Sequence, residues 1–353
     1  AFFNCEEADR VPWGVWINDD YFTHLLGIKL RDYYMNPDIM MKVQLYRWEV
    51  LPHLTREPKM VIPNFGSLVT ESTLGCEIAF PENSHPFIKA PIIKKPEDVD
   101  RLRVPDPRRD GLMPKIIEYY EYMKRKVGDK IKVGFRGGGN VGAVTIAAMI
   151  RGIDNFLIDV YRNPKMVHKL LTICMGADIE LIKFSKEFTG APWEGVGLGD
   201  DCAGFLPPRL YEEFAFPYNK KVFDTFGGRK SYHSETIRLD HIDIALRYGL
   251  DQFCSGTVDD LYISSDFKAL RKLVGDRGVA FNTRLRQRTI RYGTPTDVMN
   301  ETKCILRDTA PGGGVLVGCH VAGPEYPIQN AEAFVQTMEK YGRYPFKSIP
   351  RQI

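Results

Sequence analysis

Residues 230–254 read KSYHSETIRLDHIDIALRYGLDQFC, a stretch whose pattern predicts one strand, one helix and a second strand in succession. A short run at 230–233 comes first, and helical spacing follows over 237–248. Gly249 ends the helix, and a second short run occupies 250–254. This order predicts a βα unit of a parallel sheet.

The same alternation recurs along most of the chain. A closed (β/α)8 barrel and an open doubly wound sheet both fit it. We favour the barrel because polar residues follow many different strands, whereas a doubly wound sheet gathers them at one switch point. An eighth strand is expected near residue 13, and the seven clear strands lie at 59–65, 131–135, 196–198, 230–233, 250–254, 279–282 and 315–319. Helices are expected at 114–126, 164–188, 207–226, 237–248, 265–274, 295–308 and 328–341.

The expected domain organisation is simple. Residues 1–353 should form one barrel domain, in which 1–58 is a helical and aromatic-rich N-terminal extension. Within that extension, 36–54 show helical spacing, with Asn36 as the cap and Pro37 at the first helical position. Residues 75–109 are rich in proline and low in periodicity, so they are expected to form a long loop.

The composition narrows the class of protein. Of 353 residues, 44% are hydrophobic and 26% are charged, which excludes a disordered chain and a coiled coil. Lys and Arg number 48 and Asp and Glu 45, and a net charge of +3 gives no support for nucleic-acid binding. Apolar runs are too short to span a bilayer, and no signal-peptide pattern occurs. Seven cysteines without a CxxC pattern favour a reducing, cytoplasmic location.

Two acidic residues, Asp200 and Asp201, follow a strand that ends Gly-Leu-Gly. At the C-terminal end of a barrel strand, such a pair can bind a cation or transfer a proton, so both are catalytic candidates. The alternative is that one of them caps a helix or orders the following loop.

Two further strand ends carry candidates for a metal site. His233 and Glu235 are two residues apart, so their side chains share one face, and this spacing suits zinc. The alternative is a buried histidine that bonds a nearby carboxylate. Cys319 is the third metal candidate, although it could equally be a small buried side chain. His320 is a catalytic candidate and a reserve ligand; adjacent strand residues face opposite ways, so one of the two is expected in the site.

Other polar side chains near strand ends are candidates for substrate binding. Arg136 precedes three glycines, which would let a flat ligand approach the backbone, and a dinucleotide site is the disfavoured interpretation of this stretch. Arg284 offers a positive charge for a substrate acid, or an ion pair at the surface. The substrate-binding candidates are Arg136, Tyr218, Tyr232, Asn282 and Arg284.

The order and spacing of several blocks resembles the uroporphyrinogen decarboxylase superfamily over about residues 11–345. The blocks are GDDCAG at 199–204, PRLYEEFAFPYNKK at 208–221, YHSE at 232–235, FNTR at 281–284, GTP at 293–295, GGG at 312–314, CH at 319–320 and YGRYP at 341–345. The resemblance implies a distorted (β/α)8 barrel. Members of the superfamily often form homodimers, and the sequence leaves the oligomeric state open.

The resemblance also favours one of two branches. True decarboxylases carry an Arg-rich N-terminal motif that grips the propionates of a tetrapyrrole, whereas 10–16 here (RVPWGVW) contain a single arginine. Corrinoid-linked methyltransferases that activate thiols hold zinc through His-x-Cys and a distal Cys. His233 and Cys319 match these positions, whereas Glu235 stands in place of the middle Cys, and the oxygen ligand that it offers suits an ether or alcohol substrate.

The implied activity is transfer of a methyl group from a small methoxylated substrate to a corrinoid (cobalamin) carried by a partner protein. Zinc would act as the Lewis acid. The alternative is a metal-free decarboxylase or lyase that acts on a carboxylated aromatic or a tetrapyrrole. A non-catalytic corrinoid carrier is disfavoured because the sequence lacks the Asp-x-His-x-x-Gly pattern of such proteins.

Overall fold

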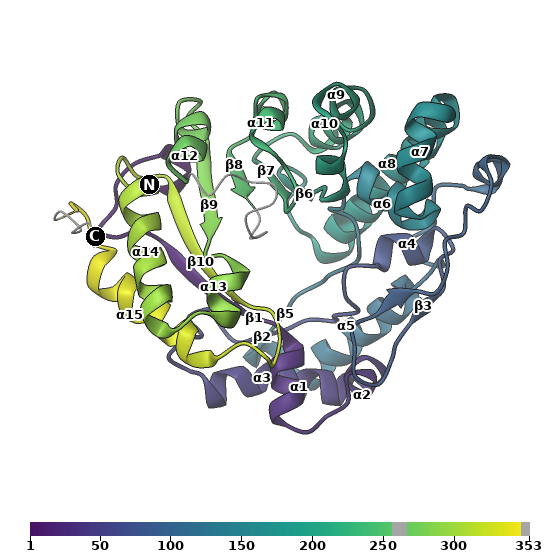
Figure 1. The fold of residues 1–353 in the computed structure, drawn as a ribbon. Helices are drawn as coiled ribbons and strands as arrows, with labels where there is room; N and C mark the ends of the chain where they lie inside the picture. The colour runs from purple at the N-terminus through teal and green to yellow at the C-terminus, as the bar shows by residue number, and fades with distance from the viewer. Residues whose placement is uncertain (256–266, 347–353) are drawn as a thin grey trace. The chain divides into compact units, whose positions relative to one another are not determined.

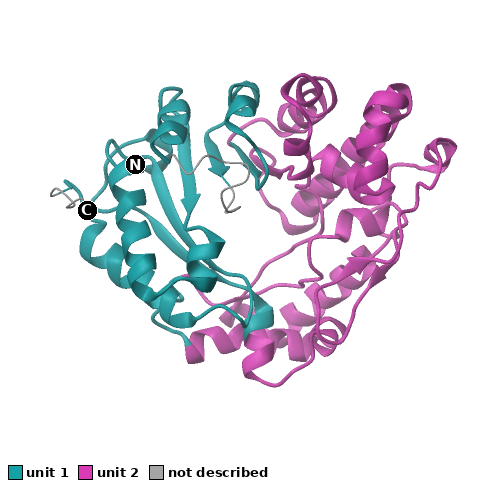
Figure 2. Cartoon of the chain, in the orientation of Figure 1, with its two compact units in different colours: residues 1–21, 51–56, 230–353 teal, residues 22–50, 57–229 magenta. Residues whose placement is uncertain are grey.

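The computed structural model describes residues 1–255 and 267–346, which fall into two compact units (Figure 2). Unit 1 comprises Ala1–Tyr21, Leu51–Arg56 and Lys230–Ile353. Unit 2 comprises Phe22–Val50 and Glu57–Arg229. That 1–353 form a single barrel domain stays a prediction.

Unit 1 is built on a parallel sheet (Figure 1). Each neighbouring pair of its strands is parallel, as βα repetition requires. In spatial order the strands of this unit are β1 (Trp13–Ile17), β10 (Val315–Val321), β9 (Ala280–Arg284), β8 (Gln252–Ser255) and β7 (Lys230–Ser234). The predicted strands at 230–233, 250–254, 279–282 and 315–319 are therefore confirmed.

Helices follow the strands of unit 1 in the predicted order. The helix α14 (Pro295–Thr309) begins with a capping box. In it, the side chains of Thr294 and Asp297 each accept a hydrogen bond from the backbone N–H of the other residue. The predicted helix at 265–274 starts outside the described residues and is seen from Phe267 onward. The helices are α11 (Leu239–Leu246), α12 (Phe267–Gly275), α13 (Gln287–Tyr292), α14 (Pro295–Thr309) and α15 (Ile328–Tyr341), with a 3-10 turn η1 (Phe2–Asn4) near the N-terminus.

The strand expected near residue 13 is confirmed, and it belongs to the sheet. β1 pairs with β10 over its whole length, from Trp13 opposite Val317 to Ile17 opposite Val321. Residues 13–17 are thus a structural strand within the segment 1–58 that was expected to be an extension. After β1 the chain enters α1 (Asp19–Leu25), which leads into unit 2.

Unit 2 is mostly helical, with short strands. β2 (Met60–Val61) and β5 (Lys132–Val133) pair in parallel, and Gly199 at the end of β6 (Val196–Gly199) forms a parallel bridge with Val141. These strands confirm the predicted runs at 59–65, 131–135 and 196–198. The helices are α2 (Leu30–Met35), α3 (Pro37–Val50), α4 (Val69–Thr73), α5 (Met113–Val127), α6 (Ala143–Arg151), α7 (Ile153–Arg162), α8 (Pro164–Thr189), α9 (Pro208–Phe214) and α10 (Phe216–Phe226), with 3-10 turns η2 (Pro96–Arg101), η3 (Gly128–Lys130) and η4 (Cys202–Phe205).

Two local predictions for unit 2 concern the Asn36 cap of α3 and the long loop at 75–109. The first is confirmed, and the second is confirmed in part. The Asn36 side chain accepts hydrogen bonds from the N–H groups of Asp38 (2.9 Å) and Ile39 (3.2 Å), so it caps α3 as predicted. The expected loop contains a small antiparallel pair, β3 (Ile78–Ala79) and β4 (Phe87–Ile88), as well as η2. Two-residue strands leave too little periodicity to be read from sequence.

No helix of residues 1–255 or 267–346 combines the length and the apolar character that crossing a bilayer requires.

The glycine turn before β10 shows why residues 312–314 must be small. Gly312, Gly313 and Gly314 have φ of +83°, +73° and +66°, a region that side chains with a Cβ rarely adopt. A Cβ on Gly313 would lie 2.1 Å from the backbone carbon of Glu6, whereas a Cβ on Gly312 would have no atom within 4 Å. The N-terminal segment therefore packs directly against this turn.

This contrast gives a matched pair of substitutions. Gly312→Ala should lower the unfolding free energy by about 1–2 kcal/mol, the cost of a left-handed alanine. Gly313→Ala carries the same cost and must also displace the Glu6 backbone, so its loss should be roughly 3 kcal/mol or more. Urea unfolding of both variants measures the difference, and equal losses would contradict this packing.

Candidate functional site

One face of the unit 1 sheet carries most of the polar candidates. In the strand register His233 lies opposite Cys254, Cys254 opposite Asn282, and Arg284 opposite Gly318. His320, two residues beyond Gly318, is paired with Trp16 of β1. Because side chains alternate along a strand, these residues share a single face, which we call the polar face.

His233, Glu235 and Cys254 form the centre of the polar face. The His233 Nε2 atom lies 3.2 Å from Glu235 Oε1. Burial lowers the pKa of the His233 imidazole, but hydrogen bonds to Cys254 and Glu235 outweigh burial and raise the pKa from 6.5 to about 10. The imidazole is therefore protonated at neutral pH in this arrangement.

Arg284 places a second cation beside the same groups. Its Nη2 lies 3.7 Å from Cys254 Sγ and its Nη1 lies 3.7 Å from Glu235 Oε1. The guanidinium carbon lies over the Trp16 ring, 5.3 Å from its centre, which is within the range of a cation–π interaction. Arg284 therefore lies on the polar face with its side chain 19% exposed, and its role in substrate binding stays a prediction.

His320 also faces this side of the sheet. Its Nε2 lies 3.0 Å from Asn18 Oδ1 and its Nδ1 lies 3.4 Å from the Gln287 amide nitrogen. Burial and the neighbouring Arg284 lower the pKa of His320 against the opposing charge of Glu235. Its imidazole is neutral where that of His233 is charged, so the two histidines differ in charge on the same face.

Two predicted site residues lie on the opposite face of the sheet. Cys319 precedes His320 and is completely buried, and burial raises the pKa of its thiol well above the usual range. Tyr232 is also fully buried, with its ring 5.3 Å from that of Tyr248. The expected grouping of Cys319 with His233 and Glu235 therefore does not occur, because adjacent strand residues point apart.

The sulfur beside His233 belongs to Cys254, the last residue of the predicted strand at 250–254, which was not assigned as a ligand. The signal was available: His233 and Cys254 both lie at the ends of neighbouring strands. Asn282 shares the face, and its buried Oδ1 has no hydrogen-bond partner among the described residues. Across 1–255 and 267–346, no three His, Cys, Asp or Glu side chains are already arranged around a metal position.

Asp200, in unit 2, is a fully buried carboxylate at the end of β6. Its oxygens accept hydrogen bonds from the Thr145 N–H (2.9 Å), the Thr145 hydroxyl (2.7 Å) and the Asn219 side-chain amide (2.8 Å). Burial raises the pKa of Asp200 to about 6, although these hydrogen bonds oppose the shift. Because Thr145 is in the first turn of α6, Asp200 caps that helix, which was the structural alternative for this residue.

The other predicted site residues of unit 2, Asp201, Tyr218 and Arg136, differ in burial and in their contacts. Asp201 is half-buried at the start of η4. The Tyr218 hydroxyl lies 2.8 Å from His168 Nδ1, which ties α10 to α8, and burial raises the pKa of this tyrosine. Arg136 is exposed in the loop after β5. The roles of these residues in binding or catalysis stay predictions.

The sequence profile of the family described as "Uroporphyrinogen decarboxylase (URO-D)" matches residues 1–341. The chain belongs to the uroporphyrinogen decarboxylase family. It is therefore a member of an enzyme family, and the resemblance of its sequence blocks to this superfamily is confirmed.

Two curated relatives, both named uroporphyrinogen decarboxylase, show how distant the family members are. The protein of Nostoc punctiforme is 30% identical over 248 residues, which span 65% of this chain and 64% of that protein. The protein of Synechococcus sp. strain CC9605 is 27% identical over 312 residues, or 85% of this chain and 82% of that protein. At such identity, the family name does not determine the substrate of this member.

A solved structure shows the fold of this uroporphyrinogen decarboxylase family member. A methyltransferase from Methanosarcina mazei aligns over 97% of each chain with a TM-score of 0.74 and 19% identity. The predicted distorted (β/α)8 barrel is confirmed by this likeness together with the family match.

Sequence reasoning missed a group of buried acids in unit 2. Burial raises the pKa of Glu71 from 4.5 to about 7, and the pKa of Asp178 is raised well above its usual range by burial and by nearby Asp200 and Glu71. Glu71 Oε2 and Asp178 Oδ2 have no hydrogen-bond partner among the described residues. Isolated acids on helices give no sequence signal, because their burial depends on tertiary packing.

Glu71 should make the stability of this family member depend on pH. Its pKa is higher in the folded than in the unfolded chain, so its contribution is full below about pH 4 and is lost as pH rises through 7. Glu71→Gln should remove this dependence. Urea unfolding between about pH 4 and pH 8 should change the difference between wild type and variant by about 3 kcal/mol. The exposed Glu121→Gln serves as a control, and a pH-independent difference for Glu71→Gln would contradict the burial argument.

Proposed function

We propose that this chain is a methyltransferase that moves a methyl group from a small methoxylated compound to a corrinoid carried by a partner protein. Family membership and the fold shared with a methyltransferase support this class of reaction. The observation that carries the proposal is the polar face, where His233, Glu235, Cys254 and Arg284 lie close to one another.

Methyl transfer from a methoxy group requires a positive charge beside the oxygen atom that departs. Cleavage of a methyl–oxygen bond leaves negative charge on the departing oxygen, and a fixed cation or acid beside that oxygen lowers the barrier. Arg284 lies over the Trp16 ring as one such cation, and His233 supplies a second positive charge only while it is protonated and holds no metal. The acceptor, a reduced Co(I) corrinoid, is a strong nucleophile, so no side chain is needed as a base toward it.

Zinc is part of the proposal, and the donor types of the polar face suit it. His233, Glu235 and Cys254 supply an imidazole, a carboxylate and a thiol, which are the usual zinc-binding groups, and Cys254 replaces Cys319 in the set. When bound there, zinc would supply Lewis-acid polarisation of the substrate oxygen. Arg284 would then stand beside the metal-bound groups and hold an acidic part of the substrate.

A decarboxylase is the second candidate, favoured by the names of the curated relatives. Against it, the stretch 10–16 contains a single arginine, Arg10, whose Nη1 lies 3.1 Å from Glu339 Oε2. An arginine that already pairs with a glutamate of the same chain is poorly placed to bind the propionate groups of a tetrapyrrole. This candidate predicts release of CO2 without a corrinoid.

The first experiment separates these two activities. Purified protein is incubated with methoxylated aromatics, methanol or methylamines and Co(I) cobalamin, and methylation of cobalt is followed by absorbance. A parallel assay measures CO2 from carboxylated aromatics and porphyrinogens without cobalamin. Methyl transfer alone supports the proposal, whereas CO2 release alone would replace it with the decarboxylase.

The second experiment uses two cysteines of the same sheet as a matched pair. Cys254→Ser should lower zinc content and methyl transfer by at least about tenfold, because it changes a group on the polar face. Cys319→Ser should leave zinc content unchanged, since that side chain faces the opposite side. Metal analysis of both variants and of His233→Ala measures this. An active wild type without stoichiometric zinc, or a loss of zinc in Cys319→Ser alone, would contradict the proposed set.

A further inference from the structure

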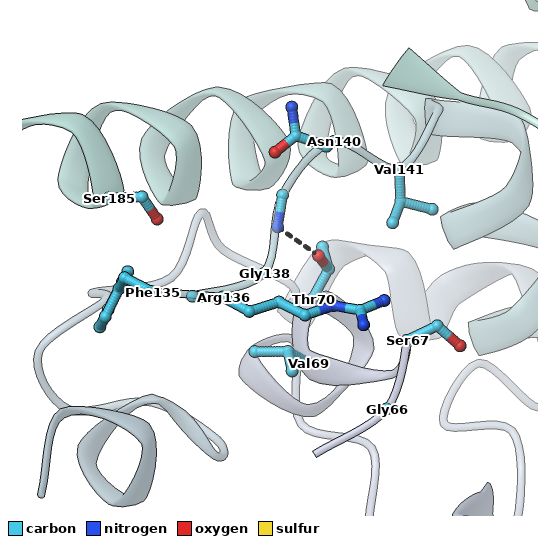
Figure 3. A pocket seen from close by; sticks show the side chains of 12 residues that line it. Gly66, Ser67, Val69, Thr70, Phe135, Arg136, Gly138, Asn140, Val141 and Ser185 are labelled. Atoms are coloured by element: carbon cyan, nitrogen blue, oxygen red, sulfur yellow. Dashed lines mark hydrogen bonds between the residues drawn. The ribbon is translucent and has the colours of Figure 1, made fainter. Parts of the chain in front are cut away.

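Unit 2 contains a separate cavity at the glycine-rich loop that follows β5. Its volume is about 260 Å³, the liquid volume of roughly nine water molecules, so it suits a small ligand. The walls come from α4, from α8 and from the loop itself (Figure 3). The lining residues are Gly66, Ser67, Val69, Thr70, Phe135, Arg136, Gly137, Gly138, Gly139, Asn140, Val141 and Ser185.

The loop can form this wall only because its residues are glycine. Gly138, Gly139 and Asn140 have φ of +73°, +73° and +66°, three successive residues in a conformation that most side chains avoid. A Cβ on Gly138 would lie 2.9 Å from Val69, and one on Gly139 would lie 2.8 Å from Ile182. The backbone therefore packs closely on α4 and α8, and the Gly139 N–H donates to Thr70 Oγ1 at 3.0 Å (Figure 3).

Arg136 gives the cavity its charge. It is the one ionisable residue among the lining residues, and its side chain extends along the cavity toward Ser67 and Thr70 (Figure 3). Within the described ranges, the structure gives Arg136 no hydrogen bond and no ion pair, and the N–H groups of Gly138 and Asn140 also have no partner there. The cavity thus presents several unused donors and a positive charge, with no carboxylate on its walls.

We propose that this cavity binds a small organic carboxylate. A guanidinium matches both oxygens of a carboxylate, and the Ser67 hydroxyl and backbone N–H groups add donors in the same space. Phe135, Val69 and Val141 provide apolar surface for the carbon skeleton of the acid. Binding at this site does not depend on the proposed reaction.

Binding of benzoate tests the site without turnover or corrinoid. Calorimetric or NMR titration of the wild type should show saturable binding of benzoate, with benzamide, its neutral analogue, at least about tenfold weaker. Arg136→Gln should weaken benzoate binding by about tenfold or more, and Arg136→Lys should retain part of the affinity as a point charge. Arg125→Gln, at an exposed position of α5, should bind like the wild type.

Thermal unfolding confirms that each variant is folded. Benzoate affinity in Arg136→Gln equal to that of the wild type would overturn the site, and so would a folded wild type that binds benzamide as well as benzoate or binds neither. Because the readout is binding, a failure here leaves methyl transfer untouched, and absence of methyl transfer leaves a positive titration standing.

Discussion

The parallel register of the unit 1 sheet is the constraint on which the candidate site depends. Hydrogen bonding between neighbouring strands fixes which residues lie opposite one another, and the two-residue period of each strand then assigns every side chain to one of two faces. His233, Cys254 and Arg284 meet for this reason alone, although they are far apart in sequence. A slip of one residue in any strand would replace these groups with the buried side chains of the other face.

Burial favours the neutral form of the ionisable groups on the polar face and of the buried acids in unit 2, but the outcome differs between the two sets. On the polar face, close partners of opposite charge outweigh burial, and His233 stays charged. In unit 2, Glu71 and Asp178 lack such partners and burial favours their neutral forms. Asp200 is intermediate, because three hydrogen bonds oppose the effect of burial. The protonation state of each group thus depends on its partners as well as on its depth.

The sequence was sufficient to predict the architecture and to find part of the candidate site. Alternating runs predicted the strands because a buried parallel strand needs few residues and a clear boundary, and the family blocks agreed with them. His233, Glu235 and Arg284 were found because they end strands. Cys319 was preferred to Cys254 because family spacing alone does not reveal which face a residue occupies. The capping role of Asp200 and the burial of Glu71 depend on α6 and on tertiary packing, which no single-sequence pattern encodes.

The stacking of Arg284 on Trp16 has a practical consequence. An indole that is 37% exposed and lies under a guanidinium is sensitive to whatever displaces or neutralises that cation. Its fluorescence is an intrinsic optical probe of the polar face, separable from that of Trp13, Trp48 and Trp193 by replacing those residues with phenylalanine. Binding of a ligand at the polar face can then be followed in real time without a label.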